Sequence, residues 1–227
     1  GALYVDGEVS IANLELVRNL AFSRGGGVFV AGGSLELHHP TLLDNRALTF
    51  GGAAWVNAGG LLVANGIIAE NEDGLGTGDT SQIAKSGFAS VTVDESLITG
   101  FAGGLAGSGS FAGTPVFANK RGPDGVLGTI DDDLTPAEGS VAVDAAGAAL
   151  PTDVLDLDDD GNTAEPLPLD ANGAPRALDD ELVPDRVGLV ADLGAREYVP
   201  GCLADLDGDG SVGTADLLGI LAEFGRS

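Results

Sequence analysis

The chain has 227 residues, a formal net charge of −25 at pH 7 and a single cysteine. This charge argues against nucleic acids and anionic membrane surfaces as partners, because binding them requires many lysines and arginines. It favours calcium as a ligand and a soluble acidic surface. One cysteine excludes an internal disulfide framework, and no apolar run is long enough to predict a membrane-spanning helix.

The first seventy-odd residues repeat with a period of 26. The phrase GGGVFVAGG at 25–33 returns as GGAAWVNAG at 51–59. A fixed period in this range is typical of stacked repeats, in which no single unit can bury its apolar face alone. The predicted columns are Leu3–Phe29–Trp55, Tyr4–Val30–Val56, Val9–Leu35–Leu61, Ile11–Leu37–Val63, Leu16–Leu42–Ile68 and Asn19–Asn45–Asn71.

Within each unit, apolar residues alternate in about three short bursts separated by glycine pairs or asparagine-containing turns. A period of two indicates β-strands, and the glycine density excludes helix. The sequence therefore predicts an all-β parallel β-helix with about 26 residues per coil. Trp55, the only tryptophan, is then expected in the core rather than on a sugar-binding platform.

The two histidines, His38 and His39, suggest a catalytic role at first sight. The period, however, places His39 in one column with Asn13 and Asn65. Asparagine side chains form hydrogen-bonded ladders along stacked turns. His39 is therefore predicted to be a structural member of a turn ladder.

After residue 71 the repeat continues with a shift of 30, which relates Leu61 to Val91, Val63 to Val93 and Ile68 to Ile98. The four extra residues fall in the segment 71–87 (NEDGLGTGDTSQIAKSG). This segment is predicted to be a loop that protrudes from the coil. Loops on rigid scaffolds often carry binding sites, so it is the place for a site within the fragment.

Beyond Phe101 the period fades, and a series of phrases resembles the C-terminal turns of secreted bacterial β-helix proteins of the pectate-lyase-like, choice-of-anchor type. The resemblance implies a right-handed, single-stranded parallel β-helix over 1–198, ending in an irregular closing region. Proteins of this type usually contain Ser-Pro-Ala-Ile-Asp-Ala-Gly, whereas 140–146 reads SVAVDAA. The phrases are TPVFAN (114–119), GPDGVLGTIDDDL (122–134), AEGSVAVDAAG (137–147), LDLDDDGNTAEPLPLDANGAPR (155–176) and DLGAREY (192–198).

The closing region contains one candidate calcium loop. Asp156, Asp158, Asp160 and Asn162 stand at alternate positions, with Gly161 where a sharp turn is needed. Oxygen ligands at this spacing can converge on calcium. The twelfth position is Leu167 rather than a carboxylate, and Glu165 and Asp170 are the nearest substitutes. A solvated acidic turn is the alternative.

The last residues, 199–227, carry the strongest motif of the chain. Ligand positions 1, 3, 5, 7 and 12 of a calcium loop are filled by Asp205, Asp207, Asp209, Ser211 and Asp216. An amphipathic helix is predicted to follow over 217–224. The phrase CLADLDGDGSVGTADLLGILAEFG at 202–225 resembles a dockerin-type repeat, of which a full module has two. The resemblance implies a cohesin-like or cell-surface protein partner.

No nucleophile–base motif or metalloprotease motif is present, so no catalytic residue is predicted. The leading hypothesis is a non-catalytic extracellular or cell-surface scaffold with calcium as its cofactor. The chain lacks a signal peptide and starts inside a repeat, so it is expected to be part of a longer precursor.

The alternative to a scaffold is a polysaccharide lyase or glycoside hydrolase with catalytic coils upstream or in the 71–87 loop. A strand-face column of carboxylates with one basic residue and exposed aromatic rings would favour the enzyme.

Overall fold

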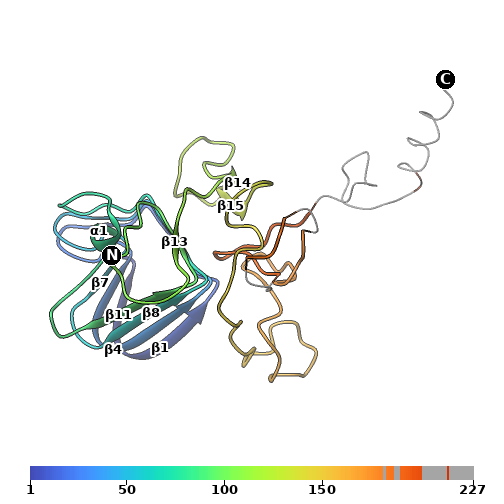
Figure 1. The fold of residues 1–227 in the computed structure, drawn as a ribbon, viewed down its shortest axis with the longest axis horizontal. Helices are drawn as coiled ribbons and strands as arrows, with labels where there is room; N and C mark the ends of the chain where they lie inside the picture. Colours follow the sequence, from blue (N-terminus) through green and yellow to red (C-terminus); the bar gives the residue numbers. More distant parts are fainter. Residues whose placement is uncertain (181–182, 187–189, 201–213, 215–227) are drawn as a thin grey trace.

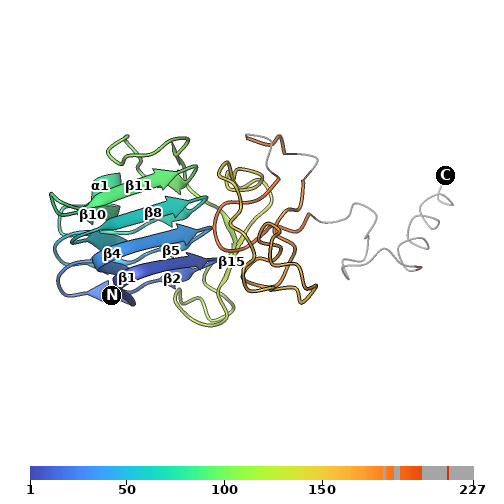
Figure 2. The same cartoon turned by 90° about the horizontal axis from the view of Figure 1, so that it is seen from below.

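The computed structural model describes residues 1–180, 183–186, 190–200 and 214. The first half of the chain winds into a parallel β-solenoid of about four turns, stacked one above another (Figure 2). The predicted parallel β-helix is therefore confirmed, and its right-handed winding stays a prediction. No described helix is both long and apolar enough to cross a membrane.

Two sheets and one short strand pair form the sides of the solenoid. The first sheet contains β1 (Leu3–Ala12), β4 (Val28–His38), β7 (Ala54–Val56), β8 (Gly60–Ala64), β10 (Ile83–Lys85) and β11 (Ser90–Asp94). The second sheet contains β2 (Glu15–Val17), β5 (Thr41–Leu43), β9 (Ile67–Ala69), β12 (Leu97–Ile98) and β13 (Phe111–Ala112). The pair consists of β3 (Leu20–Ala21) and β6 (Arg46–Ala47).

The strand register agrees with the period over most of the solenoid. Leu35 pairs with Val9 and with Leu61, and Leu61 pairs with Val91 across the longer coil. The side chains of Leu35, Leu61 and Val91 are part of the solenoid core, together with residues such as Leu42, Ile68 and Ile98, whereas Val9 in the first coil is 37% exposed. Parallel strands placed in register stack like residues on like, which explains why the apolar columns recur in the sequence.

The predicted register at the start of the chain is wrong by one residue. Tyr4, not Leu3, pairs with Phe29, and Phe29 pairs with Trp55. The register shifts between Val5 and Asp6, because β4 carries one extra residue there. Trp55 lies on the outer face of its strand, because its neighbours on β7, Ala54 and Val56, face the core. It is nevertheless only 7% exposed, since Arg24 and Phe50 pack against its ring.

The asparagine column forms a buried hydrogen-bonded ladder. The side-chain amide of Asn19 donates to Oδ1 of Asn45 at 2.9 Å, and that of Asn45 donates to Oδ1 of Asn71 at 3.0 Å. Asn71 in turn donates to Oε1 of Gln82 at 3.1 Å. The ladder thus extends into the coil with the insertion.

The segment 71–87 is not the protruding loop that the sequence predicts. It contains a single helical turn, α1 (Asp79–Gln82), and β10, which pairs with β7. The Asp79 carboxylate accepts hydrogen bonds from the backbone N–H groups of Ala102 and Gly104. Although burial opposes ionisation, these bonds hold the pKa of Asp79 below its ordinary value. The ends of the segment are therefore part of the solenoid wall, and only a short, largely exposed turn at 74–78 lies between them.

The corner between the two sheets is formed by residues in the left-handed backbone conformation. Asn13, His39, Asn65 and Glu95 occupy it in successive coils, with φ between 46° and 56°. Asparagine tolerates this conformation better than most residues. The prediction that His39 belongs to a turn ladder is confirmed, because Asn65 Nδ2 lies 3.1 Å from its Nε2.

The remainder of the chain, the closing segment (113–200), lies beside the stack of coils rather than on its end (Figures 1 and 2). Its regular structure includes the antiparallel pair β14 (Phe117–Asn119) and β15 (Asp133–Pro136). It covers the outer face of the second sheet. There Leu43, Ile67 and Leu97 form a second apolar core with residues of the closing segment such as Leu134, Ala145 and Leu193.

Candidate metal centre in the closing segment

The acidic loop 153–165 is closed at its stem by backbone pairing. Thr152 and Pro166 form an antiparallel bridge, and the N–H of Asp153 donates to the carbonyl of Glu165 at 2.8 Å. A second bond joins the N–H of Leu167 to the carbonyl of Pro151 at 2.7 Å. The stem therefore holds the two ends of the loop together.

Within the loop, the structure brings together three of the predicted ligands. One carboxylate oxygen from each of Asp156, Asp158 and Asp160 lies within 4.8 Å of the other two. The backbone turns sharply here, with Asp156 at φ 54° and Gly161 at φ 85°, as the glycine position predicts. Two oxygens bound to one calcium ion are at most about 5 Å apart, because each Ca–O distance is about 2.3–2.6 Å. The spacing fits a calcium ion.

A second group of carboxylates shares Asp158. Asp153, Asp158 and Glu165 also place one oxygen each within 4.8 Å of one another. The Oε1 atom of Glu165 is buried and accepts no hydrogen bond. Burial raises the pKa of Glu165, and the nearby charges of Asp160 and Asp158 raise it further. Glu165, one of the two substitutes that the sequence suggests for the twelfth ligand, thus contributes a carboxylate oxygen to this second group.

The other residues considered for this loop have different partners. Asn162 donates its side-chain amide to Oε2 of Glu165 at 3.1 Å, and its Oδ1 accepts from the N–H of Ala164. Leu167 is buried. Asp170 accepts hydrogen bonds from the backbone N–H groups of Asn172, Ala174 and Glu197, outside the loop. Asp153 was not predicted from the sequence, because it precedes the alternating pattern.

None of the salt bridges among the described residues involves a carboxylate of this loop. Carboxylates held this close repel one another unless a positive charge compensates them. A hard divalent cation coordinated by oxygen atoms would supply that charge. The arrangement is therefore a candidate calcium site with Asp153 and Glu165 added to the three predicted aspartates.

No protein-family model, curated protein or solved structure matches this chain. The likeness to secreted β-helix proteins and to dockerin repeats remains a prediction from the quoted phrases. Function is therefore inferred from the fold and from the chemistry of individual residues.

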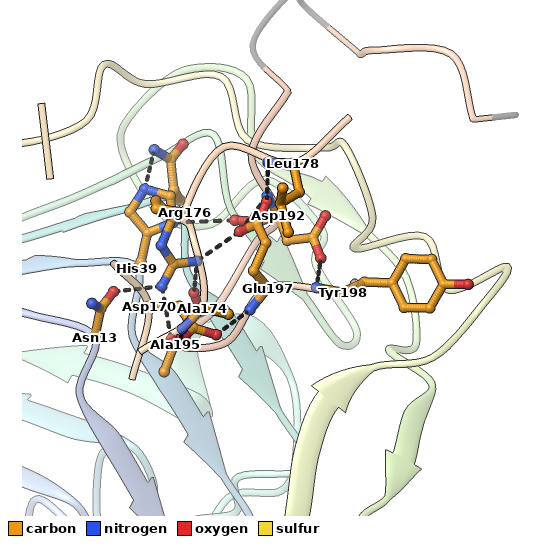
Figure 3. Close-up of polar contacts among 12 residues, drawn as sticks. Asn13, His39, Asp170, Ala174, Arg176, Leu178, Asp192, Ala195, Glu197 and Tyr198 are labelled. Atoms are coloured by element: carbon orange, nitrogen blue, oxygen red, sulfur yellow. Dashed lines mark hydrogen bonds and ion pairs between the residues drawn. The ribbon is translucent and has the colours of Figure 1, made fainter. Parts of the chain in front are cut away.

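A buried polar cluster lies where the closing segment meets the solenoid (Figure 3). At its centre, Arg176 and Glu197 form an ion pair with an Nη1–Oε2 distance of 3.2 Å, and both side chains are 0% exposed. Arg176 also donates to the carbonyls of Gly194 and Ala195 and to Oδ1 of Asn13. One arginine therefore joins two parts of the closing segment to the first coil.

Asp192 and His39 extend this buried polar cluster. The Asp192 carboxylate accepts from the backbone N–H groups of Asp144 and Tyr198, at 2.8 and 2.6 Å. Its backbone carbonyl lies 3.1 Å from Nδ1 of His39, which must carry the proton because a carbonyl only accepts. Burial raises the pKa of Asp192 to about 7 and also raises that of Glu197. Burial, reinforced by Arg176, holds the pKa of His39 well below its ordinary value.

Shifted pKa values often mark catalytic sites, but this cluster is inaccessible to a substrate. His39, Arg176, Asp192 and Glu197 are each at most 2% exposed. Their partners are largely backbone groups of the closing segment, so their evident role is to fasten that segment. The phrases AEGSVAVDAAG, NGAPR and DLGAREY contribute Asp144, Arg176, Asp192 and Glu197 to this region.

The C-terminal calcium loop falls outside the described residues. This applies to all five predicted ligands: Asp205, Asp207, Asp209, Ser211 and Asp216. The predicted helix 217–224 lies outside them as well. Both remain predictions.

Proposed function

We propose that this chain is a non-catalytic scaffold, located outside the cell or at its surface, whose β-solenoid presents a calcium-binding closing segment and a C-terminal docking or sorting module. The solenoid provides a rigid support of stacked strands. Calcium is expected to order the acidic loop 153–165 on one side and the loop 205–216 at the C-terminal end.

The observation that supports this proposal is the convergence of the loop 153–165 carboxylates. Two groups of three oxygens, sharing Asp158, each lie within 4.8 Å. The distance between the outer ends of the loop is fixed by the stem, which reduces the entropy lost when calcium orders the ligands. Calcium coordination needs carboxylate oxygens at this spacing.

Calorimetric titration of the full chain with calcium tests the proposal. Asp156→Asn/Asp158→Asn should remove the binding event of the loop 153–165, and Asp205→Ala/Asp209→Ala should independently remove that of the C-terminal loop. Asp6→Asn/Glu36→Gln is the matched control, because it removes the same charge from exposed positions on β1 and β4. Unchanged binding in the Asp156/Asp158 variant would refute the closing-segment site.

The docking partner is expected to be a cohesin-like or other cell-surface protein. The test is binding of a purified cohesin module to the full chain, with calcium and with a chelator. Calcium-dependent binding that disappears in Asp205→Ala/Asp209→Ala supports the docking module. Failure to bind any cohesin while the calcium site persists would leave sorting or anchoring as its role.

A second candidate function, polysaccharide binding or cleavage, is favoured by the aromatic column on the outside of the first sheet. The rings of Tyr4 and Phe29 stack with centroids 5.8 Å apart and an interplanar angle of 4°. Tyr4 is 67% exposed, and the guanidinium of Arg24 lies 4.6 Å from the ring centre of Trp55. The exposed ring of Tyr4, stacked on Phe29, is the part of this column that could bind a sugar ring.

Affinity electrophoresis with neutral and acidic polysaccharides distinguishes this candidate. Tyr4→Ala should weaken retention on a polysaccharide that is truly bound, whereas Phe22→Ala, an exposed aromatic outside the stacked pair, should not. Release of reducing or unsaturated sugar ends would be required before the chain is called an enzyme. Retention that is equal for all three proteins would exclude the aromatic column as a binding surface.

A further inference from the structure

A third group of carboxylates is formed by residues outside the loop 153–165, where the chain near residue 180 meets the turn at Asp144. One carboxylate oxygen from each of Asp144, Asp179 and Asp185 lies within 4.8 Å of the other two. Asp179 and Asp185 are exposed, while Asp144 is only 1% exposed. The group therefore has one buried member and an open side.

The buried member is incompletely satisfied. The Oδ2 atom of Asp144 accepts a hydrogen bond from the N–H of Asp180 at 3.2 Å. Its Oδ1 atom is buried and has no hydrogen-bond partner. A buried carboxylate oxygen without a partner is unfavourable, and almost all such atoms in folded proteins are paired.

The negative charges of the neighbouring carboxylates make a positive partner for Asp144 more favourable. Burial raises the pKa of Asp144 to about 6, and the charges of Asp179 and Asp185 contribute to this rise. Arg186 is close in sequence, but its guanidinium pairs with Glu95 at 2.8 Å and lies 4.4 Å from the ring centre of Phe111. Arg186, the nearest arginine in the sequence, therefore already contacts residues of the last coil.

Backbone N–H groups of two neighbouring residues donate hydrogen bonds to Asp144. The N–H of Arg186 donates to the carbonyl of Asp144 at 3.1 Å, while the N–H of Asp180 binds its side chain. Asp144 itself is held in the left-handed conformation at φ 49°, and its N–H donates to Asp192. The backbone of Asp144 is therefore held at both its N–H and its carbonyl, and its carboxylate is held by one hydrogen bond.

We infer that Asp144, Asp179 and Asp185 form a binding site for one divalent cation of the calcium class, separate from the loops 153–165 and 205–216. The cation accepts the unpartnered Asp144 oxygen as a ligand, and the exposed side leaves room for water to complete its coordination. Its effect is to fasten Asp179 and Asp185 to the turn that packs on the solenoid. This site does not depend on the proposed docking function.

The test uses a full-length background variant in which the other two loops are disabled: Asp156→Asn/Asp158→Asn combined with Asp205→Ala/Asp209→Ala. Calcium binding to this variant is measured by equilibrium dialysis. Asp179→Asn/Asp185→Asn is then added, because both residues are exposed and their replacement should leave folding intact. Asp6→Asn/Glu36→Gln in the same background controls for the loss of two negative charges.

The expected result is one calcium ion bound per chain in the background variant, with at least a tenfold loss of affinity on adding Asp179→Asn/Asp185→Asn and no loss in the control. Hydrogen exchange at the amides of Asp180 and Arg186 should slow when calcium is added, and this protection should disappear in the same variant. No calcium binding in the background variant would overturn the inference, as would equal binding after Asp179→Asn/Asp185→Asn. Either result leaves the test of the 153–165 loop unaffected, since that loop is disabled throughout.

Discussion

The Oδ1 atom of Asn45 accepts hydrogen bonds from both the backbone N–H and the side-chain amide of Asn19, one coil earlier, at 3.0 and 2.9 Å. Asn71 makes the same two bonds with Asn45. Each rung thus satisfies polar groups of the coil before it. Gln82 continues the ladder and donates to the carbonyl of Thr99. The ladder therefore runs from the first coil into the coil with the insertion.

Asn45→Ala should destabilise the protein by about 2–4 kcal/mol, because it leaves polar groups of Asn19 and Asn71 buried without partners. Urea unfolding measures the loss. Asn57→Ala is the matched control: this asparagine lies on the neighbouring coil and is exposed. Equal unfolding midpoints for the two variants would show that the ladder does not stabilise the solenoid.

Gly59→Ala should destabilise the solenoid by more than about 1 kcal/mol. Gly59 has φ 80°, and a Cβ atom there would lie 1.8 Å from the carbonyl oxygen of Gly33 in the preceding coil. Gly78→Ala is the comparison, because Gly78 has φ −66° and open space around its Cα. Thermal unfolding of both variants checks the difference, and a stable Gly59→Ala protein would argue against the close stacking of these turns.

Arg176→Met should cost about 3–5 kcal/mol, because the buried Glu197 carboxylate loses its cationic partner and must either stay uncompensated or take up a proton. Limited proteolysis should then cut the closing segment more rapidly. Adding Glu197→Gln should restore part of the lost stability, since it removes the unpaired charge. Arg121→Ala, at an exposed position, is the control for loss of an arginine. If Arg176→Met unfolds at the wild-type urea concentration, the buried ion pair does not fasten the segment.

His39 should stay neutral in the folded protein as the pH falls through 6.5, because burial and the charge of Arg176 hold its pKa well below that value. In the unfolded chain the same imidazole binds a proton near pH 6.5. The unfolded state then carries more protons, so His39 makes the protein less stable as the pH falls through 6.5. Nitrogen NMR shifts of the His39 ring report its protonation directly. Titration of this ring near pH 6.5 in the folded protein would contradict its burial.

The period alone predicts most of the solenoid, because parallel in-register stacking repeats the same environment in every coil. Val9, Leu35 and Leu61 share a column for this reason. The prediction fails at Leu3, since counting by a fixed period assumes coils of equal length and β4 holds an extra residue opposite the Val5–Asp6 step. It fails in part at 71–87, where the chain makes only a short exposed turn and then returns to the wall through α1 and β10.

The sequence of the closing segment has no period, so its position beside the solenoid could not be predicted. One signal was present, however. The second-sheet strands have consecutive apolar residues, such as Leu42–Leu43 and Ile67–Ile68, instead of strict alternation. Continuous apolar runs are typical of strands buried on both faces. The Asp156–Asp160 spacing predicted the loop, whereas Asp153 and Asp144 reach their carboxylate partners through folding of the closing segment.

The central claim, that the closing segment binds calcium in the loop 153–165, is tested most directly by diffraction from crystals of the full chain grown with calcium. The account predicts an anomalous difference peak about 2.3–2.6 Å from carboxylate oxygens of the Asp156–Asp158–Asp160 group or of the Asp153–Asp158–Glu165 group. A loop in the same conformation with no peak at either group, at calcium concentrations well above those outside cells, would contradict it.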